Sequence, residues 1–180
     1  MENGDWIKTK EILNSHQNIL REDITALKKT VLHMAVFAGH ENIVKKLVKR
    51  MSENDLEKRD RYGYTALAET TLHGNCKMAE YMIKKNKKLV SVKSLAKLLP
   101  VVLAVLHRHM ELARYLYRCT PLKDLTTENS VNGATLIVTT KNGGFGLRFF
   151  GPCSLKCLMP RFLKTGLKTR RPSRVFKTGP

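Results

Sequence analysis

Hydrophobic residues recur in one pattern along the first two-thirds of the chain. A spacing of i, i+1, i+4 and i+5 places four apolar side chains on one side of a helix. Three segments share this spacing: Ile43, Val44, Leu47 and Val48, then Met78, Ala79, Met82 and Ile83, and finally Leu112, Ala113, Leu116 and Tyr117. The pattern predicts three amphipathic helices in equivalent positions, about 35 residues apart.

A short motif precedes these helices at the same period. Thr30-Val31-Leu32 recurs as Thr65-Ala66-Leu67, 35 residues on, and as Thr135-Leu136-Ile137, 105 residues on. Gly39, Gly74 and Gly144 each follow their threonine by nine residues, and Gly4 extends the register backwards. One copy lacks both residues, but its segment Leu106–His109 still aligns with Leu72–Asn75. The chain therefore contains an internal repeat.

Each position that recurs between copies of the repeat has a structural role. Thr30 and Thr65 are expected to cap helices, because a hydroxyl accepts hydrogen bonds from N–H groups of the first turn. Gly39 and Gly74 are expected to end those helices in the left-handed conformation. Turn residues at 60–63 and 130–133 predict hairpins between repeats. Lys28 stands at the glycine position of the first hairpin, so an irregular first hairpin is expected.

The segment Thr30-Val31-Leu32-His33-Met34-Ala35 resembles the ankyrin signature, and the likeness covers about residues 4–144. Gly4-Asp5-Trp6, with Ile12 and Leu13, is more narrowly similar to plant ankyrin proteins of the accelerated-cell-death type. The resemblance implies an all-α solenoid of three to four helix-turn-helix repeats with short β-hairpin fingers. It also implies that His33 has a structural role, with hydrogen bonds to neighbouring backbone. The C-terminal membrane domain of full-length relatives is not found in this sequence.

The predicted repeat fails near its C-terminal end. Continuing the helical stripe into the fourth copy places Pro152 inside a helix, at a cost of about 3 kcal/mol. We expect a partial capping repeat at 1–29, ankyrin repeats at 30–144 with the last incomplete, and a disordered basic tail at 145–180. The incomplete repeat leaves Leu112, Leu116 and Tyr117 covered only by the half-repeat around Leu136 and Ile137, which predicts a frayed end and a tendency to associate.

The net charge of +18 has two origins. Residues 129–180 hold ten Lys or Arg and no Asp or Glu, which leaves 18 − 10 = +8 for residues 1–128. Weak, non-specific contact of the tail with nucleic acid or anionic lipid is one expectation. In the repeats, seven lysines and one arginine gather near the ends of the second helices, where they complement the helix dipole as ordinary surface. They are Lys45, Lys46, Lys49, Arg50, Lys84, Lys85, Lys87 and Lys88.

Candidate chemical motifs are incomplete. His40-Glu41 begins a zinc motif, but Val44 replaces its second histidine, and the pair Cys153 and Cys157 is short of the four ligands of structural zinc. The glycine-rich segment 143–146 lacks the Lys-Ser/Thr of a phosphate loop. His107 and His109 are expected to be solvated or lightly packed. We therefore expect no metal, no cofactor and no enzyme activity.

The sequence predicts a cytoplasmic protein. The acidic N-terminus has no signal-peptide pattern, and the longest apolar stretch, 98–106, is about half as long as a membrane-spanning helix. The four cysteines do not form a secreted disulfide framework. A peripheral position at the cytosolic side of a membrane is the alternative.

The resemblance implies a protein-binding scaffold, since ankyrin arrays bind partners along the concave side made by hairpin tips and first helices. Plant stress or defence signalling is the process that it implies. Two alternatives are an electrostatic tether, in which the tail binds nucleic acid or anionic membrane, and a truncated product without a function of its own. The predicted partner-binding residues are Phe37, Arg61, Tyr62, Tyr64, Leu72, His73, Leu106, His107, Val131 and Asn132.

Overall fold

The protein is built from three consecutive helix pairs. The computed structural model describes residues 9–11, 15, 18–126, 132–133 and 135–136. The pairs are α2 (Val31–Phe37) with α3 (Glu41–Arg50), α5 (Ala66–His73) with α6 (Cys76–Lys85), and α7 (Pro100–Leu106) with α8 (Met110–Cys119). Three short helices follow second members of the pairs: α4 (Glu53–Leu56), η1 (Lys87–Ser91) and α9 (Leu122–Thr126).

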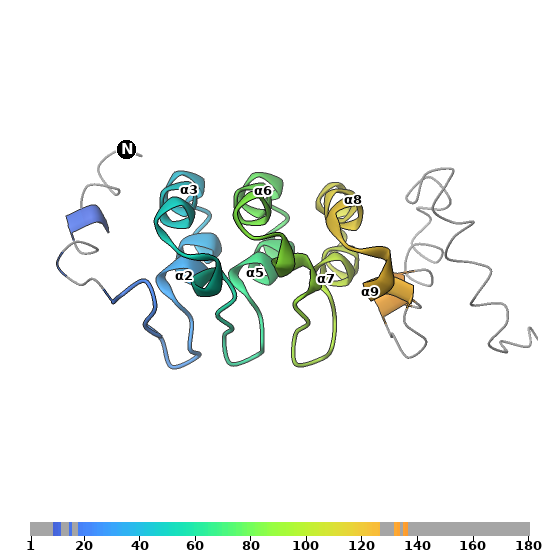
Figure 1. Cartoon of the computed structure of the whole chain (residues 1–180), viewed down its shortest axis with the longest axis horizontal. Helices are drawn as coiled ribbons and strands as arrows, with labels where there is room; N and C mark the ends of the chain where they lie inside the picture. The colour runs from blue at the N-terminus through green and yellow to red at the C-terminus, as the bar shows by residue number, and fades with distance from the viewer. Residues whose placement is uncertain (1–8, 12–14, 16–17, 127–131, 134, 137–180) are drawn as a thin grey trace, which may run out of the picture.

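The helix pairs stack side by side into an elongated array with two rows. Figure 1 shows the first helices α2, α5 and α7 in one row and the second helices α3, α6 and α8 in the other. The loops between pairs project from the first row, all in one direction. Neighbouring pairs pack through both rows, α2 on α5 and α3 on α6. The predicted all-α solenoid is confirmed, and its described residues contain no β-strand.

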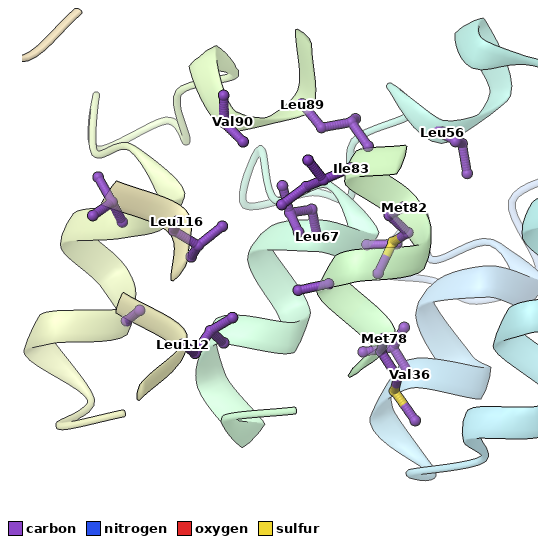
Figure 2. Close-up of a cluster of buried hydrophobic side chains, with 14 of the residues drawn as sticks. Val36, Leu56, Leu67, Met78, Met82, Ile83, Leu89, Val90, Leu112 and Leu116 are labelled. Carbon is purple, nitrogen blue, oxygen red and sulfur yellow. The ribbon is translucent and has the colours of Figure 1, made fainter. Parts of the chain in front are cut away.

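One continuous core runs between the rows. The predicted stripes of the second helices face this core, with Leu47 and Met82 fully enclosed and Ile43 and Tyr117 partly buried. The expectation that Leu112 and Leu116 have little cover was wrong, since they are 1% and 0% exposed. Figure 2 shows Met82 and Ile83 of α6 beside Leu67 of α5, Met78 near Val36 of α2, and Leu112 and Leu116 of α8 on the other side of α5. Each helix pair therefore buries its apolar stripe against its neighbours, and the array depends on the stacking of successive repeats.

The ends of α5 follow the predicted pattern, whereas at α2 the Thr30 hydroxyl lies 2.9 Å from Nδ1 of His33 instead of capping a backbone N–H, and the third pair has substitutions. The Thr65 hydroxyl accepts from the N–H of Ala68 at 3.3 Å, and Gly74 ends α5 with φ +74°. In the third pair Pro100 occupies the first helical turn, a position that needs no N–H donor. Arg108 takes the place of the glycine and adopts the same left-handed conformation, with φ +62°.

The three projecting loops, here called fingers, are closed by one common hydrogen-bonding scheme. We number them finger 1 (24–29), finger 2 (60–64) and finger 3 (94–98). In each, one N–H donates to a carbonyl three residues earlier at 2.9 Å: Lys28 to Thr25, Gly63 to Asp60 and Lys97 to Ser94. The prediction of an irregular first finger holds for one hydrogen bond only: the N–H of Ile24 donates to the carbonyl of Lys29, five residues on, whereas the equivalent bonds of fingers 2 and 3 span four residues. The turn of finger 1 is regular. Lys28 adopts φ +57° and Lys97 φ +59°, so both fill the glycine position in its left-handed conformation.

Adjacent fingers are joined by single backbone hydrogen bonds. The N–H of Arg61 donates to the carbonyl of Leu27 at 2.8 Å, and the N–H of Leu95 donates to Tyr62 at 3.2 Å. A side chain joins finger 3 to the next copy, where the Asn132 amide accepts from the Leu99 N–H and donates to the Lys97 carbonyl. Asn132 therefore binds the backbone at the N-terminus of α7. The residue at the cap position of α7, Leu99, has no side-chain oxygen and makes no side-chain cap bond of its own.

We expect the two helix-ending glycines to differ in their tolerance of alanine. A Cβ at Gly39 meets no atom within 4 Å, so Gly39→Ala costs only the left-handed strain of about 1 kcal/mol. At Gly74 a Cβ lies 2.3 Å from Nδ1 of His109, whose Nε2 bonds the Leu72 carbonyl at 3.0 Å. Gly74→Ala is therefore expected to cost about 2 kcal/mol in urea unfolding. Equal losses would contradict this view of the His109 contact.

Some predicted features lie outside the described residues. These are the N-terminal segment 1–8, the second helix of the fourth copy, the tail 145–180 with Cys153 and Cys157, and the glycine-rich segment 143–146. Within the described part of the chain, no helix is long and apolar enough to cross a membrane.

Candidate functional site

Large apolar side chains are exposed mainly on one side of the array. Of seven such residues in the described part, six lie on fingers or near the ends of first helices. We call this set the finger face: Ile24, Leu27, Phe37, Tyr62, Leu95 and Leu106. Figure 1 shows that the fingers project from the row of first helices, so the set belongs to one side of the array. Exposed apolar residues that gather on one side are typical of a binding surface.

The structure exposes several of the predicted partner-binding residues. Phe37 is 57% exposed and Tyr62 55%, and Leu106 is also exposed. The remaining predicted side chains on the first helices and on finger 2 are exposed or half-buried: Arg61, Tyr64, Leu72, His73 and His107.

One of the predicted residues, Asn132, does not contribute to this surface. Asn132 is 2% exposed because its amide is used between finger 3 and the next copy, so including it was wrong. Val131 lies outside the described residues.

Three residues of the finger face were missed from the sequence. Leu95, at the tip of finger 3, is 72% exposed, more than any other large apolar side chain described. Ile24 and Leu27 lie on finger 1. Their signal was weak because the threonine motif is absent from the third copy and the glycine from the first and third fingers. The turns of the three fingers begin at residues 25, 60 and 94. When the fingers are aligned on these residues, Leu27 and Tyr62 fall within one position of Leu95.

An ion pair between Lys29 and Glu69 lies next to Phe37 of the finger face. Nζ of Lys29 lies 2.8 Å from Oε1 of Glu69, which is 2% exposed. The same Nζ lies 5.3 Å from the ring centre of Phe37, and the Phe37 ring meets the edge of His73 at 5.6 Å. The ion pair thus crosses from finger 1 to α5 and orients Phe37, because the ring packs against both a cation and an imidazole.

His33 links the first repeat to the second. Its Nε2 lies 3.0 Å from the carbonyl oxygen of Tyr64, an acceptor, so Nε2 carries the proton and Nδ1 accepts. Nδ1 receives the N–H of Thr30 at 3.3 Å, and the Thr30 hydroxyl lies 2.9 Å away. The structural role that the resemblance implied for His33 is confirmed. It fixes finger 2, and therefore Tyr62 and Tyr64, relative to α2.

We expect the stability of the array to fall below neutral pH through His33. Burial lowers the pKa of this imidazole below its ordinary value of 6.5. Because the unfolded chain then binds a proton more readily, the stabilisation is complete above pH 6.5 and is lost as pH falls through the lower folded-state pKa. His33→Gln is expected to lose about 2 kcal/mol at pH 7 in urea unfolding.

The measurement that isolates His33 is the difference between parent and variant at two pH values. This difference should shrink from pH 7 to pH 5, because only the parent loses the His33 contribution. A difference that does not depend on pH would show that the pKa of His33 is the same in the folded and unfolded states, and that His33 acts by packing alone.

Comparison with known families agrees with this geometry. The family model described as ankyrin repeats, in three copies, matches residues 8–94. The match ends before α7 and α8, but this third helix pair continues the same stack and finger scheme. A search of the curated proteins gave no significant match. Ankyrin repeats generally mediate protein–protein interaction and are typically non-catalytic.

Proposed function

We propose that this array of ankyrin repeats binds another protein through the finger face, and that the chain acts by binding and not by catalysis. The observation that carries the proposal is the gathering of six exposed apolar side chains on one side of the array. Phe37, Tyr62 and Leu95 are its most exposed members, and aromatic residues are frequent anchors of protein interfaces. Arg61, Tyr64 and His73 supply polar groups at its rim.

The internal bonding of the array favours a partner surface that is held in place before binding. His33 fixes finger 2 against α2, and the pair Lys29–Glu69 holds the surroundings of Phe37. Because these anchors are ordered by the fold, little of the binding free energy is lost in ordering them. A partner with a complementary apolar patch suits this surface best.

The process in which the chain acts is also part of the proposal. The resemblance of the N-terminal segment to plant ankyrin proteins of the accelerated-cell-death type favours a scaffold in stress or defence signalling in the cytoplasm. We further propose that residues 1–29 cap the array and that residues 30–144 form the binding unit.

The test is capture of partners by the tagged full chain from native tissue. Phe37→Ser combined with Tyr62→Ser is expected to weaken the captured complex by about 30-fold or more, because two anchor side chains are lost. Leu122→Ser is the matched control, since Leu122 is 45% exposed but lies on α9, away from the fingers. Equal capture by the anchor variant and the parent would overturn the proposal.

A further inference from the structure

A second candidate surface lies between two second helices, in the row away from the fingers. Helices α3 and α6 lie side by side in this row (Figure 1), and a groove of about 320 Å³ runs between them. Four lysines, one tyrosine and one valine line this groove, here called the lysine groove: Lys45, Val48, Lys49, Tyr81, Lys84 and Lys85.

The floor of the lysine groove is apolar. Val48 is buried there, and Nζ of Lys45 lies 5.3 Å from the ring centre of Tyr81. The Tyr81 hydroxyl donates to Oε1 of Glu41 at 3.1 Å, so its polar end is already occupied. An occupant therefore meets an aromatic ring, a valine and the aliphatic stems of lysines, all of which favour an apolar side chain.

The rim of the lysine groove carries uncompensated positive charge. Lys84 is paired with Glu80 at 2.7 Å, one turn earlier on α6. Lys45, Lys49 and Lys85 form no ion pair with the described residues. Complementing the helix dipole explains a cation in the last turn of each helix. It does not explain why lysines of two adjacent helices surround one apolar hollow.

The neighbouring groove provides an internal comparison. Helices α6 and α8 enclose a space of about 340 Å³, whose charged lining residues are Glu80, Glu111, Arg114 and Arg118. Two acids and two bases line that groove, although Glu80 is also the partner of Lys84, so its lining carries far less excess positive charge than the lysine groove. The lysine groove differs in its charge and not in its size.

We propose that the lysine groove binds an acidic segment of a partner protein, one that inserts an apolar side chain between α3 and α6. Carboxylates of the segment pair with Lys45, Lys49 and Lys85, and its apolar residue covers Val48 and Tyr81. A flat anionic membrane presents charge but does not reach a recessed apolar floor. Nucleic acid phosphates match the rim, and arginine forks would serve them better than lysine ammonium groups. This site is independent of the finger face and goes beyond the function proposed above.

The experiment titrates the full chain with a fluorescein-labelled peptide of about ten residues, which spans the groove when extended. The peptide consists of Asp and Glu with one central Leu. Anisotropy at low salt is expected to show binding that is about tenfold weaker for Lys49→Gln/Lys85→Gln, because two charge pairs are lost. The matched control, Lys93→Gln/Lys123→Gln, removes the same charge at exposed positions outside the groove and should bind as the parent does.

Two further arms separate the sources of binding. A peptide with Ser in place of the central Leu is expected to bind about fivefold more weakly to the parent, because the apolar floor is left uncovered. Thermal unfolding checks that both double variants remain folded. The basic residues of 145–180 are retained in every variant, so binding by that segment leaves the two double variants equal, and such equality overturns the proposal. Groove-dependent binding of phosphatidylserine vesicles or single-stranded RNA, with none of the acidic peptide, overturns it as well.

Discussion

Replacing Lys29 by methionine is expected to lower the free energy of unfolding by about 3 kcal/mol, the largest effect of a single charged residue in the array. The reason is Glu69, which is 2% exposed and whose carboxylate lies 2.8 Å from the lysine ammonium. Removing Lys29 leaves the Glu69 carboxylate without water and with only the His73 imidazole, 3.9 Å away, beside it. Urea unfolding measured by circular dichroism gives this quantity directly.

Two further variants test whether the pair is responsible. Lys29→Met combined with Glu69→Leu is expected to recover most of the loss, because no charge is then left buried. Lys84→Met is the exposed control, since the side chains of Lys84 and Glu80 are 70% and 42% exposed, and its effect should be much smaller than that of Lys29→Met. If the double variant were no more stable than Lys29→Met, the loss would come from the lysine stem packed near Phe37.

Replacing Leu67 by alanine is expected to cost about 3 kcal/mol of unfolding free energy as well. Leu67 is fully buried in α5, and Figure 2 shows it facing α6 within the core cluster. Truncation removes transfer free energy and leaves a cavity that the stacked helices fill only in part. Because α5 lies between α2 and α7, the cavity weakens contacts with both neighbours.

The same substitution at Leu106 provides the comparison for Leu67. Leu106 ends α7 and is 44% exposed, so Leu106→Ala should change stability by less than about 1 kcal/mol. Similar losses for the two leucines would mean that the central helix is not the best-packed part of the array.

The sequence predicted the repeat because local motifs determine it. Thr65 caps a helix and Gly74 ends one through hydrogen bonds and backbone angles within a few residues of each. The buried faces of the second helices were also predictable, because the spacing of their apolar residues alone places Leu47 and Met82 on the side that faces the core. The regular turn of finger 1 was missed, since a left-handed lysine is rare and the contacts that hold Lys28 there come partly from finger 2.

The supporting contacts of the finger face were harder to predict. Lys29 and Glu69 are 40 residues apart, and their meeting depends on how two repeats stack. One signal was present, because Glu69 falls at a position occupied by Met34 and Leu103 in the other copies. An acid among apolar residues at a repeated position indicates a buried charge with a partner. Leu95 carried no comparable signal, because the finger tips vary in sequence from copy to copy.

The way the helix pairs stack also affects how quickly the chain reaches its native state. Most packing joins a helix to the next one or two along the chain, as α2 joins α3 and α5. Proteins with such short-range contacts close only small loops during folding and reach the native state rapidly. Since α5 and α6 have neighbours on both sides, we expect ordering to nucleate at this central pair and to propagate outward, with the outermost pairs unfolding first under denaturant.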